Sequence, residues 1–175
     1  MYQGEKFVFI FNKSNLESPK MQISENFKLS EFTNSKTADK KKIDNTPSPS
    51  ERANIYTLVN EILQPIRSKF GKSIKVNSGF RCKNLNKAVF GSSTSQHLTG
   101  SAADITTYDS NDELFRLILQ MIDDGAIVVG QLIWEYGNDN YPQWIHISLP
   151  NAGKVNNILR AKKLSGNSTI YLPYR

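Results

Sequence analysis

Two apolar segments in the second half of the chain constrain the fold more than any other feature. Residues 126–136 and 144–148 are rich in β-branched and aromatic side chains, which favour strands. Between them, residues 137–142 form a connector rich in turn-forming residues. The pattern predicts a β-hairpin, and therefore an antiparallel sheet with helices grouped against it rather than strands that alternate with helices.

The other periodic segments supply two helices and two further strands. Apolar residues recur at three- and four-residue steps over residues 51–70 and 112–122, as in helices that bury one face. Residues 73–78 alternate like a half-buried strand, and residues 102–107 are a second short strand candidate. Residues 28–50 look irregular and predict a long loop or linker. Together these elements predict a single α+β domain with an antiparallel sheet flanked by helices.

We divide the chain into an N-terminal extension, residues 1–25, and one domain, residues 26–175, that ends in a short strand. The five apolar residues at 7–11 indicate a strand or an arm that packs elsewhere. This run is too short for a signal peptide and no small-residue cleavage site follows it, so we expect synthesis in the cytoplasm without general secretory export. No apolar run approaches the about 20 residues needed to cross a bilayer, which excludes an integral membrane protein.

Composition narrows the classes of function. The 175 residues are 38% hydrophobic, enough for one domain to form a core without disulfides. Cys82 is the single cysteine, so a zinc site built from several thiolates is excluded, and we expect Cys82 to be a small packed residue. The net charge of +6 favours an anionic partner, either nucleic acid or an acidic cell-wall polymer. The alternative is a solvated basic surface, because residues 40–42 and 160–163 are the only basic clusters.

The chain has only two histidines, and both have unusual surroundings. His97 lies in a turn of small residues that leads into the strand carrying Asp104, and His146 lies between two isoleucines. A catalytic zinc ion needs three protein ligands and an open fourth position for water, which two imidazoles and one carboxylate would satisfy. Taken singly, each histidine also fits an ordinary core or surface role, and Asp104 fits a capping or turn role.

Four motifs along the chain, together with two upstream stretches, resemble the M15 family of zinc D-Ala-D-Ala peptidases. The four motifs occur in the same order as in that family. The resemblance covers roughly residues 26–150 and is closest to the short-chain branch common in bacteriophages and bacteria. The motifs are SGFR at 78–81, LN at 85–86, SQHLTGSAAD at 95–104 and WIHIS at 144–148. The upstream stretches are FKLSEF at 27–32 and NTP at 45–47.

The resemblance implies a fold like that of the hedgehog and D-Ala-D-Ala peptidase group, with His97, Asp104 and His146 as ligands of Zn²⁺. It also implies a place for Arg81 beside the active site, where its guanidinium would pair with a substrate carboxylate or orient the substrate carbonyl. The structural alternative for Arg81 is an anchor that holds the loop before His97. The implied substrate is the stem peptide of peptidoglycan.

One position departs from the family pattern. Many members have an Asp or Glu three residues before the last histidine as the general base, and this chain has Gln143 there. An amide cannot take the proton near neutral pH, so another carboxylate is needed. A hairpin symmetric about its turn pairs Glu135 with Trp144 and puts Glu135 on the face of His146, whereas a slip of one residue would move it away. Asp139 is a weaker substitute, and Glu135 could instead be a surface glutamate.

The leading hypothesis is a zinc metallopeptidase that cleaves an amide bond in peptidoglycan stem peptides as a phage lysis or virion protein. In addition to the metal ligands and Glu135, this hypothesis assigns substrate contacts to Arg81, Trp144 and Ser95. Packing of the hairpin is an alternative explanation for Trp144, and Ser95 could instead orient His97. A second hypothesis, supported by Gln143, is a non-catalytic zinc-containing module for wall binding or particle structure. Nucleic-acid binding, the third, lacks a recognisable motif.

Overall fold

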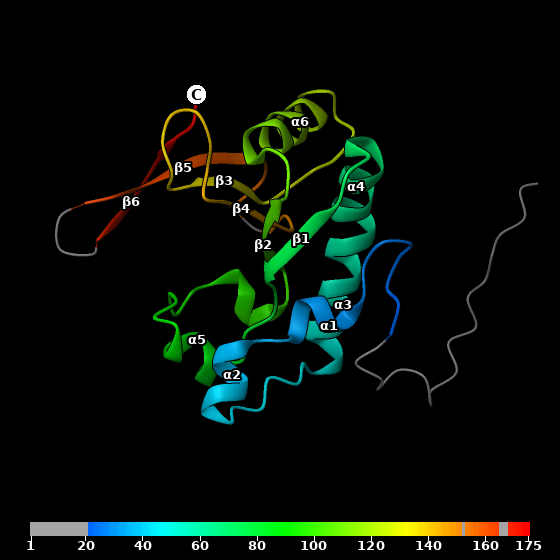
Figure 1. Cartoon of the computed structure of the whole chain (residues 1–175), viewed down its shortest axis with the longest axis vertical. Helices are drawn as coiled ribbons and strands as arrows, with labels where there is room; N and C mark the ends of the chain where they lie inside the picture. The colour runs from blue at the N-terminus through cyan, green and yellow to red at the C-terminus, as the bar shows by residue number, and fades with distance from the viewer. Residues whose placement is uncertain (1–20, 152, 165–167) are drawn as a thin grey trace, which may run out of the picture.

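The computed structural model describes residues 21–151, 153–164 and 168–175 (Figure 1). Within these ranges the helical segments are α1 (Leu29–Thr33), α2 (Lys36–Lys41), α3 (Pro49–Leu58), a π-helical turn (Val59–Leu63), α4 (Gln64–Phe70), α5 (Lys83–Ala88), a 3-10 turn (Gln96–Thr99) and α6 (Asn111–Asp123). The strands are β1 (Ile74–Ser78), β2 (Ala102–Thr107), β3 (Gln131–Glu135), β4 (Trp144–Ser148), β5 (Asn157–Lys163) and β6 (Thr169–Pro173). The fold is α+β, as the sequence predicts.

The strands form one sheet in the order β1-β2-β4-β3-β5-β6. β3 and β4 form the expected hairpin, with Glu135 opposite Trp144. The expectation of a wholly antiparallel sheet is wrong at one place, because β5 runs parallel to β3. After β4 the chain turns back and crosses to the far side of β3. The direction of β5 is therefore opposite to that of β4 and the same as that of β3.

Three segments differ from the sequence prediction. Residues 28–50 are not a simple loop, because α1 and α2 form there; Leu29 and Phe32 of α1 are buried, and Ser35 caps α2 by accepting a hydrogen bond from the Ala38 N–H. The strand expected over 126–136 begins only at Gln131. The chain ends in two strands rather than one. Residues 7–11 lie outside the described residues, so their role stays a prediction.

The helix expected over residues 51–70 is present as α3, the π-helical turn and α4 in succession. Ser48 caps its start through a reciprocal pair of hydrogen bonds with Glu51, and Pro49 occupies the first turn, where its missing N–H costs nothing. Gly71 ends it with a left-handed φ of 70°. The helix expected over 112–122 is α6. In the part of the chain that the structure describes, no helix combines the length and apolar character needed to cross a membrane.

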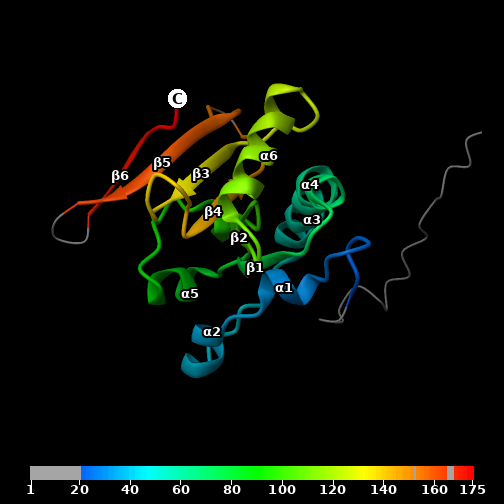
Figure 2. The ribbon, with the colours of Figure 1, turned by 45° about the horizontal axis from the view of Figure 1, so that its top comes forward.

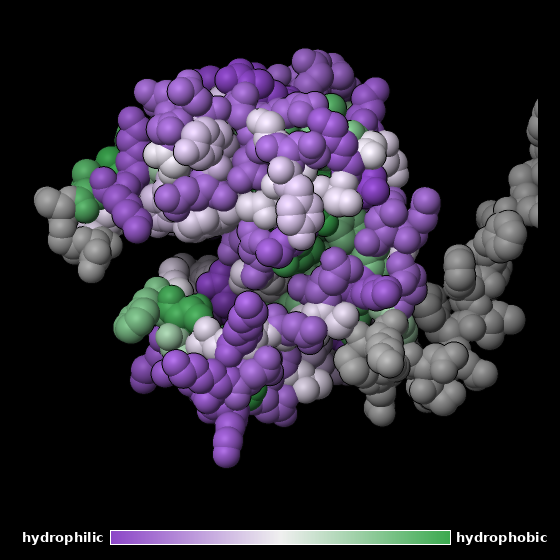
Figure 3. Space-filling view, viewed as in Figure 1, coloured by the Kyte–Doolittle hydropathy of each residue, from purple (hydrophilic) through white to green (hydrophobic). Residues whose placement is uncertain are grey.

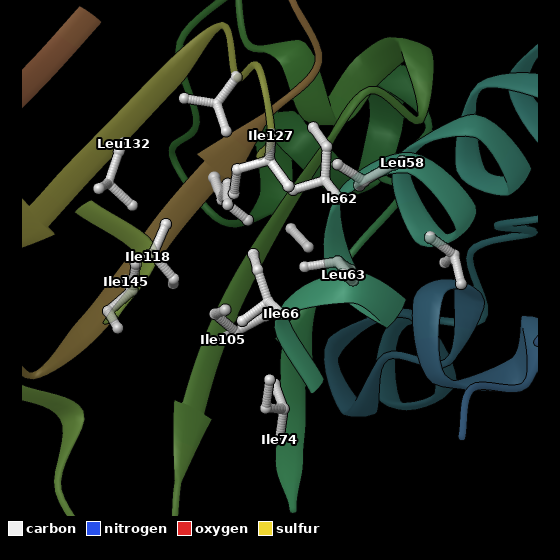
Figure 4. Packing of buried hydrophobic residues seen from close by; sticks show 14 of the residues in the cluster. Leu58, Ile62, Leu63, Ile66, Ile74, Ile105, Ile118, Ile127, Leu132 and Ile145 are labelled. Carbon is white, nitrogen blue, oxygen red and sulfur yellow. The ribbon is translucent and has the colours of Figure 1, made fainter. Parts of the chain in front are cut away.

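Helices α3, α4 and α6 lie on one side of the sheet (Figure 2), and the main core lies between them and the sheet (Figure 4). Successive residues of a strand point to opposite faces. In the central strands the residues facing these helices are Ala103, Ile105, Leu132, Trp134, Ile145 and Ile147, all buried. The residues between them, among which are Asp104, Glu135 and His146, therefore lie on the other face. The alternation gives the sheet one core face and one polar face.

A close backbone approach ties the turn that carries His97 to α3. Gly100 ends this 3-10 turn with φ at 71°, and a Cβ built there would lie 2.5 Å from the backbone oxygen of Glu51. Gly125 has a similar φ of 69°, but a Cβ there would meet nothing within 4 Å. Both positions favour glycine for its conformational freedom, and only Gly100 also needs the space.

We therefore expect Gly100→Ala to destabilise the protein more than Gly125→Ala. The left-handed backbone costs each alanine about 1–2 kcal/mol, and the clash with Glu51 adds about 1–3 kcal/mol for Gly100→Ala alone. Urea unfolding of the two variants and the parent gives both free energies. Equal losses in the two variants would show that the approach of this turn to α3 carries no constraint.

Candidate metal centre

Three potential ligand atoms converge on the polar face of the sheet. His97 Nε2 lies 3.2 Å from Asp104 Oδ1, and His146 Nδ1 lies 2.9 Å from the same oxygen. All three ligand atoms lie within 4.8 Å of one another. Ligand atoms about 2.1 Å from a tetrahedral zinc ion lie roughly 3.4 Å apart, and the two distances to Asp104 Oδ1 are close to this value. One carboxylate and two imidazoles also match the donor types of catalytic zinc sites.

The sheet register and one backbone carbonyl set this geometry. Asp104 on β2 is directly opposite His146 on β4, so their side chains share a face. His97 approaches from the 3-10 turn, and its Nδ1 lies 2.6 Å from the carbonyl oxygen of Gly79. A carbonyl can only accept, so Nδ1 carries the proton and the lone pair of Nε2 faces Asp104. Such a second contact commonly orients a metal-binding imidazole.

The electrostatics suit a cation. Burial lowers the pKa of His97 against the opposing effect of Asp104, which favours the neutral imidazole that binds metals. Burial alone would raise the pKa of Asp104, but His97 and His146 outweigh it and hold that pKa well below its usual range. The carboxylate therefore stays ionised although it is poorly exposed.

Glu135 lies on the same face and lines the same cavity as the three ligands. Only 6% of its surface is exposed, and burial raises its pKa to about 7; His146 opposes this rise and Asp104 adds to it. A carboxyl group with a pKa near 7 can both accept and release a proton under neutral conditions. The predicted pairing of Glu135 with Trp144 is confirmed, and the slipped register is not found.

The two other candidates for a proton acceptor lie elsewhere. Gln143 is exposed and lines a separate, smaller cavity, together with Asp139. The Asp139 carboxylate forms a salt bridge of 2.6 Å with Arg160, and the Asp139 side chain is largely exposed. The structure thus brings Glu135 to the ligand cluster and leaves Asp139 away from it.

Arg81 has contacts that suit both roles considered for it. Its Nη2 lies 3.4 Å from Asp104 Oδ2 and the residue lines the cavity, while its backbone N–H donates to the carbonyl of His97 at 3.0 Å. Asn45 fixes the surrounding loop: its side-chain oxygen accepts from the Cys82 N–H, and its amide group donates to the Phe80 carbonyl. Cys82 itself packs against the core and is not among the candidate ligands.

The cavity in front of the ligands has a volume of about 570 Å³ and is open to solvent. Ser95 and Trp144, both predicted to touch substrate, line it. Ser95 also caps the 3-10 turn by accepting a hydrogen bond from the His97 N–H at 3.4 Å. Several lining residues were missed by the sequence analysis, and those beyond residue 148 include Lys154, Thr169 and Tyr171. They follow the last motif, in a region where the sequence offers only a short strand pattern.

The comparison with protein families supports this site. The Peptidase M15 family model matches residues 25–148, well over half of the chain and all four motifs. The chain therefore belongs to the Peptidase M15 family, which supports assignment as a peptidase with a candidate metal site at His97, Asp104 and His146. No curated protein matches the chain.

The raised pKa of Glu135 predicts a pH-dependent stability in protein stripped of metal by a chelator. Between the ordinary pKa of 4.5 and about 7, the folded state holds a proton that the unfolded state has lost, so stability falls as the pH rises. Glu135→Gln cannot ionise, and we expect it to exceed the parent in stability by at least about 1 kcal/mol more at pH 8 than at pH 5. Urea unfolding at both pH values measures the difference.

The exposed Glu61 offers a matched control, because Glu61→Gln removes the same charge from the surface. We expect its difference from the parent to be nearly the same at both pH values. A Glu135→Gln effect equally independent of pH would contradict the raised pKa.

Proposed function

We propose that this chain is a zinc-dependent peptidase that hydrolyses an amide bond in the stem peptides of peptidoglycan. The observation that carries the proposal is the convergence of three ligand atoms and the buried carboxyl group of Glu135 in one open cavity. Membership of the Peptidase M15 family supports the same reaction class.

When bound, zinc polarises a carbonyl group and makes a water molecule more acidic. The residues of the chain supply the other parts of the reaction. Glu135 accepts the proton of the attacking water and then delivers it to the nitrogen of the departing amine, a transfer for which a pKa near 7 is suited. Arg81, held beside Asp104, donates hydrogen bonds to a carboxylate or carbonyl of the substrate. Ser95 and Trp144 supply walls of the cavity that hold the peptide.

The net charge of +6 favours encounter with peptidoglycan, whose stem peptides carry carboxylates. Action on the bacterial wall as a phage lysis or virion protein is the setting that we propose for this activity. The non-catalytic alternative rested on Gln143, and the position of Glu135 in the cavity supplies the carboxylate that Gln143 cannot.

The test is mass spectrometry of soluble products after incubation of the zinc-loaded protein with isolated sacculi and muropeptides. We expect the parent to release defined fragments. We expect Glu135→Gln to keep one zinc per chain but lose about 10²- to 10⁴-fold in rate, because it removes the general base. We expect His97→Ala to lose both zinc and activity, and Glu61→Gln to match the parent.

Zinc content, measured by atomic spectroscopy on the same samples, separates loss of metal from loss of the base. A parent that binds zinc but releases no fragment from walls of several chemotypes would overturn the peptidase and favour the wall-binding module. Full activity of Glu135→Gln would leave the peptidase intact but assign the base to another group.

A further inference from the structure

The chain beyond residue 148, where the family match ends, builds one wall of the cavity. Leu159 of β5 and Thr169 and Tyr171 of β6 line it, facing the segment around α5 that lines the opposite side. Figure 3 shows the surface hollowed between these two parts of the molecule. The last two strands therefore do more than extend the sheet, because they supply part of the lining of the cavity that holds the candidate metal ligands.

The register across four strands places Tyr171 in the same cross-strand row as Glu135. Tyr171 of β6 is opposite Ala161 of β5, Ala161 is opposite Glu135 of β3, and Glu135 is opposite Trp144 of β4. Residues in such a row point to the same face. The Cβ atoms of Tyr171 and Glu135 are thus about 10 Å apart, and both residues line the same cavity. Ala161, which lies between them in the row, is fully buried.

The strand that carries Tyr171 is fixed at both ends. The Tyr136 hydroxyl and the Thr169 hydroxyl form a hydrogen bond of 2.9 Å, which ties the start of β6 to the end of β3. Just after β6, the ring of Tyr174 stacks on Trp134 and contacts Phe115, both residues of the core. Tyr171 therefore has a defined place even though half of its surface is exposed.

The hydroxyl group of Tyr171 is protonated at neutral pH and can donate a hydrogen bond. Burial raises the pKa of Tyr171 to about 12, with smaller contributions from Glu135, Tyr136 and Asp104. The hydroxyl therefore keeps its proton throughout the neutral range. Among the described residues, none forms a hydrogen bond with this hydroxyl, which leaves the proton available to a bound molecule.

We propose that Tyr171 is a catalytic residue whose phenol O–H donates a hydrogen bond to the carbonyl oxygen of the amide bond that is cut. This inference rests on the proposed peptidase function. The oxygen gains negative charge as water adds to the carbonyl carbon, and a fixed donor stabilises that charge more than it stabilises the bound substrate. Glu135 and Tyr171 then act on the same amide group, one on the attacking water and the other on the carbonyl oxygen.

The test compares Tyr171→Phe with the parent on the soluble muropeptide that the sacculus digest identifies. We expect kcat to fall about 100-fold, as for loss of a single oxyanion donor, with KM changed less than threefold. Tyr108→Phe is the matched control, because Tyr108 is 83% exposed and does not line the cavity. It should match the parent in both constants.

Two readouts separate catalysis from a structural effect. Zinc content and the melting temperature should be the same in Tyr171→Phe and the parent, because the substitution leaves the metal ligands and the anchors of β6 in place. Affinity for a phosphinate analogue of the cleaved bond, which mimics the charged oxygen, should fall by about the same factor as kcat/KM.

The outcomes distinguish this inference from the function on which it rests. If the parent releases no fragments, both the proposed peptidase function and the role of Tyr171 are overturned. If the parent is active and Tyr171→Phe keeps its kcat within threefold, only the role of Tyr171 is overturned. A rise in KM at unchanged kcat would overturn it too, because it would assign Tyr171 to substrate binding alone.

Discussion

The antiparallel register between β2 and β4 is the constraint on which the rest of the site depends. It sets Asp104 opposite His146, and by strand alternation it places Ala103 and Ile105 in the core beneath α3, α4 and α6. A slip of one residue would bury the carboxylate among apolar side chains and turn Ile105 toward solvent. The free energy of burying the core therefore also holds the candidate ligands together.

The polar face places two poorly exposed carboxyl groups in different environments. Asp104 lies beside Arg81 and between two imidazoles, and the imidazoles lower its pKa and keep it ionised. Glu135 forms no salt bridge within the described residues, and burial raises its pKa to about 7. Because Asp104 stays ionised and Glu135 can exchange a proton near neutral pH, the pair suits the proposed roles of metal ligand for Asp104 and proton carrier for Glu135.

Most of the regular elements could be predicted, as could the three residues that form the candidate metal site, and the misses have physical causes. The helical segment from α3 to α4, helix α6 and the central strands each bury one face, so their periodicity is visible in the sequence. The helices α1 and α2 are only five and six residues long, too short to establish a period. The role of Asn45 was also missed, because its contacts with Phe80 and Cys82 join residues more than thirty positions apart.

The sequence by itself determined the α+β class and the hairpin, because local periodicity carries that information, and its resemblance to the M15 family named the three candidate ligands. Only the tertiary structure decided that Gly79 orients His97, that Asp139 lies away from the cavity, and that β5 runs parallel to β3. It also placed Tyr171 in line with Glu135. Such placements depend on which strands become neighbours, and this is settled by packing the whole core rather than by any local run of residues.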